Sequence, residues 1–162
     1  MASAERVAEK YKKTKQLRIF TKLFKALTEE EVEQLKKLTR DPSEGSMRSD
    51  LSYGRKPTTG LRFTAVLAKE GDQIVGWWSF HGPSQKKVAY VNAFVSPKYR
   101  GKGIGKSLGK EVIRHATNLG AQLLVAVPQD SAGKGLYLSL GFEKSKKDPS
   151  TLELPLPGAS TG

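Results

Sequence analysis

A glycine-rich segment at residues 95–107 constrains the fold of this chain more than any other feature. Three glycines stand at alternate positions between residues 101 and 105. Glycine lets the backbone turn tightly and approach a ligand with no Cβ in the way. The apolar run Val88–Val95 before the segment predicts a strand, and the pattern Ile104–Leu119 after it predicts a helix. Because the first amides of a helix lack intrahelical partners and attract anions, we expect a phosphate-binding loop here.

The spacing around this loop separates three kinds of phosphate-binding site. A nucleotide-triphosphate P-loop requires a glycine where this chain has Arg100. A dinucleotide fingerprint requires a glycine where Lys106 stands, or where Leu108 stands if the pattern begins two residues later. Both patterns therefore fail at a required residue. What the sequence does contain is Arg-x-x-Gly-x-Gly, as Arg100, Gly103 and Gly105.

This pattern follows Val95-Ser96-Pro97, and together they resemble the acetyl-CoA pyrophosphate loop of the GCN5-related N-acetyltransferases (GNAT), which comes after a strand ending in Val-x-Pro. A second segment, Leu136-Tyr137-Leu138-Ser139-Leu140-Gly141-Phe142, resembles the Leu-Tyr-x-x-x-Gly-Phe segment of the same family. The resemblance extends from Leu61 to about Leu154. The alternative is a plain glycine-rich turn with exposed lysines, followed by a tyrosine that only packs.

The resemblance implies that acetyl-CoA is the acyl donor. It also implies that the pantetheine arm lies between two parallel strands, Val88–Val95 and Leu123–Val127, and pairs with backbone groups near Ala93. The coenzyme-binding residues that it implies are Phe94, Val95, Arg100, Gly101, Lys102, Gly103, Ile104, Gly105 and Lys106.

The chemistry of amine acetylation assigns further roles. In the family the tyrosine hydroxyl faces the coenzyme sulfur, which implies that Tyr137 protonates the leaving thiolate. The amine must be neutral to attack, and the developing oxyanion needs a donor, such as a backbone N–H near Phe94 or Val95. The chain has no cysteine, so direct transfer within a ternary complex is favoured over an acetyl-cysteine intermediate.

The sequence leaves the general base open. Many relatives carry a carboxylate on the strand before the loop, whereas Val88–Val95 contains Tyr90 and Asn92 and no acid. Asp130 stands where relatives often have asparagine, and it either accepts a proton through water or only caps the following helix. Tyr90, Asn92 and His81 are alternatives for positioning such a water. Together with the tyrosine, Asn92 and Asp130 are the catalytic candidates.

Residues 41–60 are rich in Ser, Gly, Pro and charge, and the resemblance implies that they line the acceptor pocket. The candidates for acceptor contacts are Arg48, Asp50, Tyr53, Arg55, Lys56 and, from the strand before the loop, Tyr90. The alternative for residues 41–60 is a surface loop with no ligand role.

The charge of the chain limits its partners. The 162 residues carry a net charge of +12, so a polycationic amine would be repelled as an acceptor. Lysines concentrated at residues 10–15 and 144–147 are either solvated surface or contacts for an acidic partner such as nucleic acid. Two histidines and no cysteine argue against a metal site. The sequence has no long apolar stretch, so we expect a cytoplasmic protein with no membrane partner, either a monomer or a homodimer.

The remaining pattern predicts a single α/β (α+β) domain with a mixed, mostly antiparallel sheet of about six or seven strands. Helices flank the sheet, and a β-α-β unit lies at its centre. Strands are expected at residues 17–24, 61–68, 73–80, 88–95, 123–127, 142–144 and 151–154. Thr28 and Glu31 form a capping box before one helix, and other helices are expected at 104–119 and 132–140. We expect a basic arm at 1–15, the domain at 16–154 and a disordered tail at 155–162.

These observations favour an acetyl-CoA-dependent N-acetyltransferase that acts on a primary amine. One alternative is a non-catalytic module of the same fold that binds acyl-CoA or nucleic acid, which the missing carboxylate and the positive charge would suit. A nucleotide hydrolase is disfavoured because Arg100 replaces the first P-loop glycine.

Overall fold

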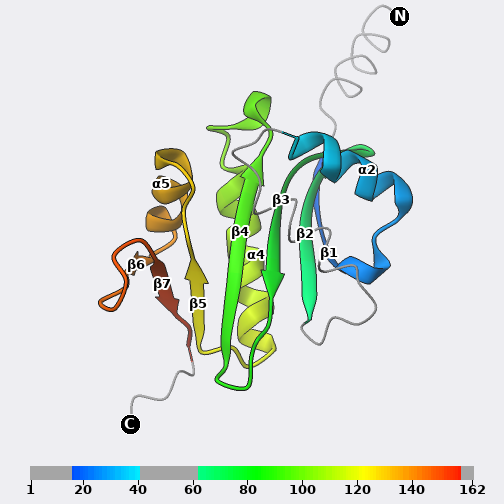
Figure 1. Cartoon of the computed structure of the whole chain (residues 1–162). Coiled ribbons are helices and arrows are strands. Elements are labelled where there is room, and N and C mark those ends of the chain that lie inside the picture. The colour runs from blue at the N-terminus through cyan, green and yellow to red at the C-terminus, as the bar shows by residue number, and fades with distance from the viewer. Residues whose placement is uncertain (1–15, 41–61, 158–162) are drawn as a thin grey trace, which may run out of the picture.

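The structure, a computed structural model, describes residues 16–40 and 62–157. A seven-stranded sheet forms its centre, in the spatial order β1-β2-β3-β4-β5-β7-β6 (Figure 1). The strands are β1 (Leu17–Leu23), β2 (Phe63–Glu70), β3 (Gln73–His81), β4 (Val88–Val95), β5 (Leu123–Ala126), β6 (Glu143–Lys144) and β7 (Leu152–Pro155). All neighbours pair antiparallel except β4 and β5, which are parallel. The predicted mixed, mostly antiparallel sheet is confirmed.

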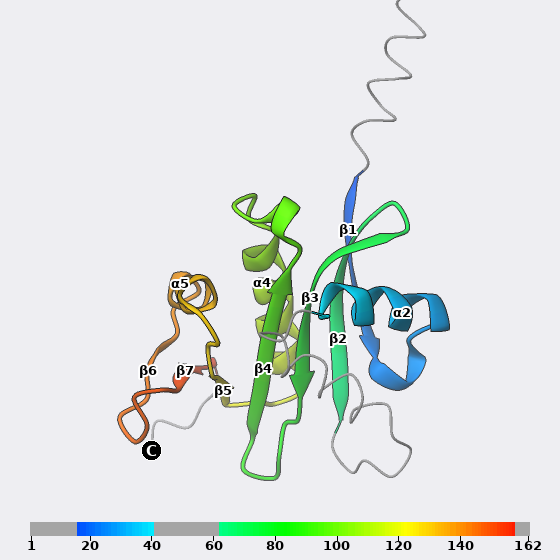
Figure 2. The same ribbon diagram turned by 45° about the horizontal axis from the view of Figure 1, so that its top comes forward.

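Helices cover both faces of this sheet. Helix α2 (Glu29–Leu38) lies on one face and α4 (Ile104–Asn118) on the other, as Figure 2 shows. Helix α5 (Ser131–Ser139) lies beside the β5 end of the sheet (Figure 1). Short 3-10 turns occupy Phe24–Ala26 and Pro97–Tyr99.

The core is divided by the sheet into two layers. Side chains alternate along β3, so Trp77 points towards α2 and Trp78 towards α4, and both are completely buried. Leu35 of α2 packs in the first layer and Leu108 of α4 in the second. Helix α4 is therefore packed against the sheet on the face opposite to α2.

Helix α2 begins at the predicted capping box. Thr28 Oγ1 accepts a hydrogen bond from Glu31 N at 3.1 Å, and the Glu31 carboxylate accepts one from Thr28 N at 2.9 Å. The two side chains satisfy amides that the first turn leaves without partners. Local sequence is sufficient to place this end of the helix.

The predicted β-α-β unit is formed by β4, α4 and β5. The parallel pairing joins only Val88–Val91 to Leu123–Ala126. Strand β4 continues to Val95, and its last residues pair with β3 on their other side. The sheet therefore opens between β4 and β5 at the end that leads into the glycine-rich loop.

The end of the domain differs from the expectation. Strand β7 extends to Pro155, and Leu156 is buried with its N–H donating to Gln122 O at 3.0 Å. The boundary expected after Leu154 is therefore wrong, because the folded domain continues at least to Leu156. The expected basic arm at residues 1–15 lies outside the described residues.

Candidate active site

A cleft of about 300 Å³ lies where β4 continues beyond β5. Its walls come from the end of β4, the glycine-rich loop, the start of α4 and the first turns of α5. The lining residues are Ala93, Phe94, Val95, Tyr99, Arg100, Gly101, Gly103, Ile104, Gly105, Lys106, Asp130, Ala132, Gly133 and Leu136. Except for Lys102, every residue that we predicted to bind the coenzyme is among them.

The loop backbone is open towards this cleft. Gly101 and Gly103 have φ angles of +78° and +82°, which side-chain-bearing residues rarely adopt. A Cβ added at either position would meet nothing within 4 Å, so the space beside the backbone is empty. Among the residues that the structure describes, no backbone hydrogen bond uses the amides of Gly101, Lys102 or Gly103. Together with the first amides of α4, they form a cradle that suits a phosphate group.

Two basic side chains of the loop make cation–π contacts with aromatic rings. Arg100 Nε donates to Val95 O at 2.9 Å, and its guanidinium lies 5.9 Å from the centre of the Phe94 ring. Lys102 Nζ lies 5.2 Å from the centre of the Tyr99 ring, although Lys102 itself is not a lining residue of the cleft. Cation–π contacts of this kind hold flexible side chains near a surface. They keep positive charge beside the cradle.

Tyr99 was not predicted as a site residue, yet it lines the cleft and anchors the loop. Its hydroxyl donates to Glu70 Oε1, at the end of β2, at 3.4 Å. Burial raises the pKa of Tyr99, and the neighbouring Glu70 carboxylate raises it further. Ser96 N donates to Val75 O at 2.8 Å, so the loop is attached to two strands before it turns. No sequence pattern links Tyr99 to Glu70, since only the fold brings them together.

The opposite wall is formed by α5, whose residues were also missed. Ala132, Gly133 and Leu136 lie on one face of α5. The helical period, combined with the position of α5 after β5, could have predicted that this face borders the cleft. A Cβ at Gly105 would lie only 3.0 Å from Leu136 Cδ2, which shows how closely α4 approaches this wall. Asp130 caps α5, its carboxylate accepting from Gly133 N at 2.7 Å. The capping alternative for Asp130 is thus observed, and its catalytic role stays a prediction.

Tyr137 lies in the core and is not a lining residue of the cleft. It is 3% exposed. Its ring meets Trp78 edge-on at 5.4 Å between centroids and Phe142 at 5.3 Å. The ring is therefore held rigidly by packing, one residue along α5 from Leu136 in the cleft wall. Its role as general acid stays a prediction.

Further side chains follow β4 away from the cleft on the face that carries α2. Tyr90 is exposed and Asn92 is half-buried on this face. Cross-strand pairing places His81 opposite Tyr90 and Ser79 opposite Asn92. The remaining acceptor candidates, Arg48, Asp50, Tyr53, Arg55 and Lys56, lie outside the described residues.

Residues 16–40 and 62–157 also bear on metal binding and on membrane insertion. That part of the chain holds no group of three or more His, Cys, Asp or Glu residues able to bind a metal ion. Nor does it hold a helix that combines the length and the apolar character needed to cross a membrane.

Comparison with known proteins identifies the family. Residues 21–142 match the family model described as the acetyltransferase (GNAT) family. The chain belongs to the GNAT family. The match begins in β1 and ends after α5, so it includes the whole cleft.

Curated relatives of this GNAT chain match over part of their length. N-acetylaspartate synthetase from Danio rerio is 33% identical over 109 residues, which cover 66% of this chain and 37% of the relative. Mycothiol acetyltransferase from Corynebacterium efficiens is 31% identical over 112 residues, covering 65% of this chain and 37% of the relative. The chain thus spans about two fifths of the length of the curated relatives that it matches.

Among solved structures, the PaiA N-acetyltransferase from Thermoplasma acidophilum, crystallised in complex with coenzyme A, has the same fold. Its TM-score is 0.65 at 19% identity, and the alignment covers 86% of this chain and 99% of PaiA. The family match and this coenzyme-bound neighbour support acetyl-CoA as the acyl donor of this GNAT chain.

Proposed function

We propose that this GNAT protein transfers the acetyl group of acetyl-CoA to a primary amine by direct attack in a ternary complex. The observation that carries the proposal is the open cradle of Gly101, Lys102 and Gly103 at one end of the cleft. A diphosphate fits such a cradle because unpartnered amides and the start of α4 both favour negative charge.

The other parts of the cleft suit the rest of the coenzyme. The end of β4, including Phe94 and Val95, is unpaired towards β5. Val95 O already accepts from Arg100 Nε, so the remaining backbone groups on that side are the ones that can receive an extended arm. Lys106 lies in the wall and Arg100 lies over Phe94, where both add positive charge. When bound, acetyl-CoA supplies an activated thioester carbonyl and a thiolate leaving group.

Groups of the chain itself are assigned to the three steps of the transfer: stabilising the oxyanion, protonating the thiolate and removing the amine proton. The open β4 edge offers backbone N–H donors near Phe94 and Val95 to a developing oxyanion. We assign proton donation to the Tyr137 hydroxyl, because packing against Trp78 and Phe142 fixes its ring one residue from the wall. We further propose that Asn92 orients a water through which the amine proton passes to the Asp130 carboxylate.

The acceptor is proposed to be an amine that is not a polycation. The net charge of +12 would repel such a molecule, and β3 and β4 contain no Asp or Glu to attract it. The name of the relative N-acetylaspartate synthetase indicates an acidic product for that protein, which is consistent with this proposal. An acidic partner such as nucleic acid, a cytoplasmic location and a monomeric or homodimeric state also stay predictions.

A second candidate is a GNAT-fold module that binds acyl-CoA without turnover. Two observations favour it: β4 carries no carboxylate that could act as base, and the Tyr137 ring is buried. Its coenzyme site would be the same, so binding alone does not separate the two functions.

Calorimetry followed by a turnover assay tests both. We expect acetyl-CoA to bind and ATP and NAD not to bind, and we expect coenzyme A release when amines of different charge are added. Binding without release for any amine would favour the module. Binding of ATP with none for acetyl-CoA would exclude both functions.

A further inference from the structure

Two aromatic rings form a flat pair on the sheet face that carries α2. His81 of β3 and Tyr90 of β4 are cross-strand partners, and their rings are stacked with centroids 5.2 Å apart and an interplanar angle of 18°. Such pairs stabilise neighbouring strands. Tyr90 is nevertheless 46% exposed, so the pair keeps an accessible aromatic surface.

The ring pair lies on the same strand face as one residue of the cleft wall. Tyr90, Asn92 and Phe94 alternate along β4 and therefore point to the same face, and Phe94 lines the cleft. At about 3.3 Å per residue, Tyr90 stands roughly 13 Å along the strand from Phe94. An acceptor whose amine enters the cleft beside Phe94 would extend along Asn92 and reach the rings with its far end.

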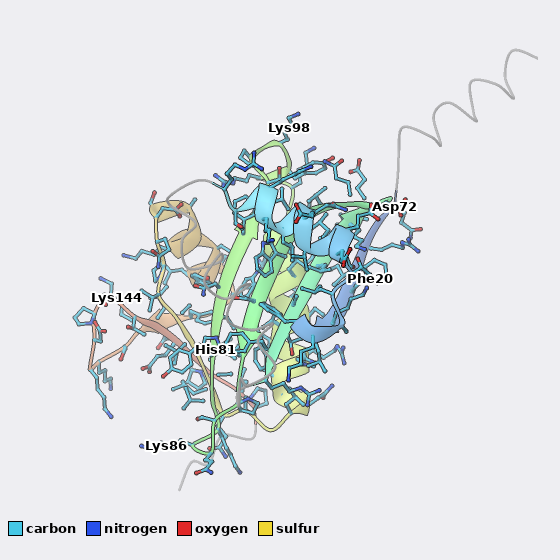
Figure 3. The ribbon with its side chains drawn as sticks, turned by 45° about the vertical axis from the view of Figure 1, so that its right-hand side comes forward. Phe20, Asp72, His81, Lys86, Lys98 and Lys144 are labelled. Carbon is cyan, nitrogen blue, oxygen red and sulfur yellow. The ribbon has the colours of Figure 1, made fainter. Side chains whose placement is uncertain are left out.

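The charged residues near the two rings indicate which charge a group stacked on the rings can carry. Neither β3 nor β4 contains a carboxylate. Among the described residues, the charged ones that adjoin this end of the two strands are basic: Arg62, whose carbonyl accepts from Gly82 N, and Lys86 and Lys87 in the β3–β4 turn. Figure 3 shows Lys86 and Lys98 at opposite ends of the sheet, with His81 between them on the face that carries α2. Within β3, β4 and the turn between them, a second ammonium group would find no counter-charge, whereas a neutral or acidic planar group would find a matching surface.

We infer that the acceptor amine carries a planar aromatic or heteroaromatic group at its far end, which stacks on the Tyr90–His81 pair. The inference rests on the proposed acetyl transfer and adds the class of its substrate. It makes Tyr90 a residue that determines specificity, and it assigns no catalytic role to His81.

The test compares amines that differ only in the flatness of the ring. Phenylhexylamine and phenyloctylamine, whose linkers approach the span between Phe94 and Tyr90, are compared with cyclohexylhexylamine and cyclohexyloctylamine as acceptors of the whole 162-residue chain at saturating acetyl-CoA. We expect kcat/KM to be about two- to tenfold higher for the phenyl amines, the size of one aromatic contact. The preference should survive in Tyr90→Phe and disappear in Tyr90→Val, which keeps a strand-forming residue. Ile19→Ala, at a residue 38% exposed on β1 of the same sheet, is the control and should keep the preference.

Equal rates for both ring types in the wild-type protein, or an unchanged preference in Tyr90→Val, would overturn the inference. Calorimetry with the same amines and coenzyme A separates this result from failure of the proposed function. Tighter binding of phenyl amines that Tyr90→Val abolishes, without turnover, would support the ring surface and overturn acetyl transfer. Equal Kd values for phenyl and cyclohexyl amines would overturn the proposed stacking on Tyr90, whether or not acetylation occurs.

Discussion

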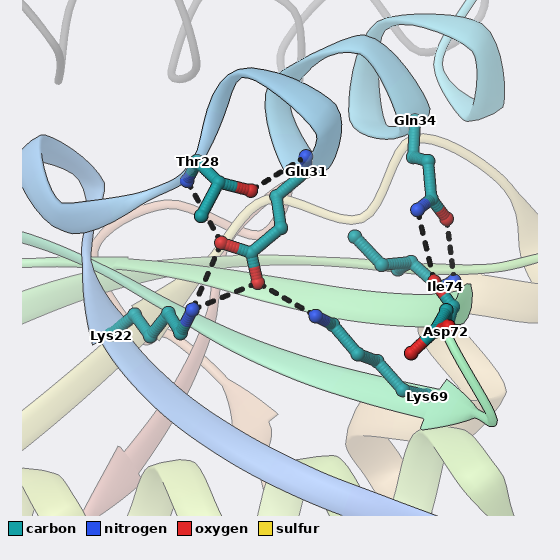
Figure 4. A network of polar contacts seen from close by, with 7 residues as sticks. All are labelled: Lys22, Thr28, Glu31, Gln34, Lys69, Asp72 and Ile74. Atoms are coloured by element: carbon teal, nitrogen blue, oxygen red, sulfur yellow. Dashed lines mark hydrogen bonds and ion pairs between the residues drawn. The ribbon is translucent and has the colours of Figure 1, made fainter.

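Glu31 on α2 and Lys69 on β2 form an ion pair with 2.8 Å between carboxylate oxygen and ammonium nitrogen. Lys22 of β1 contacts the same carboxylate at 2.9 Å, and Thr28 N donates to it (Figure 4). The Glu31 side chain is only 3% exposed. Beside this cluster, Gln34 Nε2 donates to Asp72 O, and Gln34 Oε1 accepts from Ile74 N. These contacts connect α2 to β1, β2 and β3.

Glu31→Gln should destabilise the fold, because two partly buried ammonium groups lose their counter-charge. We expect the free energy of unfolding to fall by about 2 to 4 kcal/mol, somewhat less than for a fully buried pair because Lys22 keeps contact with water. Urea denaturation measures this change. Glu33→Gln is the matched control: its pair with Lys36 is exposed, and its loss should cost less than about 1 kcal/mol. Equal effects would show that the buried cluster contributes no more than a surface pair.

The same carboxylate should make stability depend on pH. Burial alone would raise the pKa of Glu31, but hydrogen bonds from Lys69, Thr28 N and Lys22 outweigh it and lower the pKa from 4.5 to about 2. Because the folded-state pKa is depressed, the stabilisation is present above pH 4.5 and is lost as the pH falls towards 2. The difference in unfolding free energy between wild type and Glu31→Gln should therefore shrink across this range in urea titrations. A constant difference would contradict the shifted pKa.

Gly103→Ala should weaken coenzyme binding through backbone strain. The free protein has room for the added Cβ, since nothing lies within 4 Å, so crowding by the chain itself is not the reason. The φ of +82° costs an alanine about 1 to 2 kcal/mol, which favours a changed loop and predicts a roughly tenfold rise in Kd for acetyl-CoA. Calorimetry gives the Kd. Gly135→Ala, at an exposed α5 position outside the cleft wall, should bind normally. Normal binding by Gly103→Ala would remove this loop from the coenzyme site.

Gly109→Ala should lower stability although the residue is a helical glycine. Its Cβ would collide with Leu140 Cδ1 and lie 2.9 Å from Cζ2 of the buried Trp78 ring, so the Leu140 side chain would have to move and α4 would have to shift away from β3. Overpacking of this kind costs about 1 to 3 kcal/mol. Gly135→Ala meets nothing within 4 Å and should stabilise α5 by up to about 1 kcal/mol. Thermal melting of the two variants should therefore shift in opposite directions, and a shift in the same direction would contradict the close packing.

Tyr137→Phe should lower turnover and leave the KM for acetyl-CoA nearly unchanged. The ring that packs against Trp78 is kept and only the hydroxyl is lost, so kcat should fall by about a hundredfold or more if that hydroxyl is the proton donor. Steady-state kinetics with a good acceptor measure both constants. Tyr99→Phe is the control, because it removes a hydroxyl that lies on the other side of the cleft and donates to Glu70. This variant should keep the wild-type kcat. A raised KM with unchanged kcat in Tyr137→Phe would show a structural role instead.

Several parts of the fold were predictable because their causes are local. The capping box at Thr28 and the apolar period of α4 depend on residues three or four apart. The glycine-rich loop was predictable because only glycine readily adopts the positive φ of positions 101 and 103. Where distant elements meet, prediction failed: Leu156 packs in the hydrophobic core and its N–H donates to Gln122 O, which no pattern near residue 156 indicates.

By itself, the sequence determined the order of the elements, the loop that suits a diphosphate and the resemblance that the GNAT family match confirmed. Only the tertiary structure decided that the cleft lies where β4 extends beyond its pairing with β5, and that Leu136, not Tyr137, is part of the cleft wall. It also decided that His81 stacks on Tyr90. The physical reason is that hydrogen bonding and periodicity act between near neighbours in the chain, whereas a cleft is defined by where strands end relative to one another.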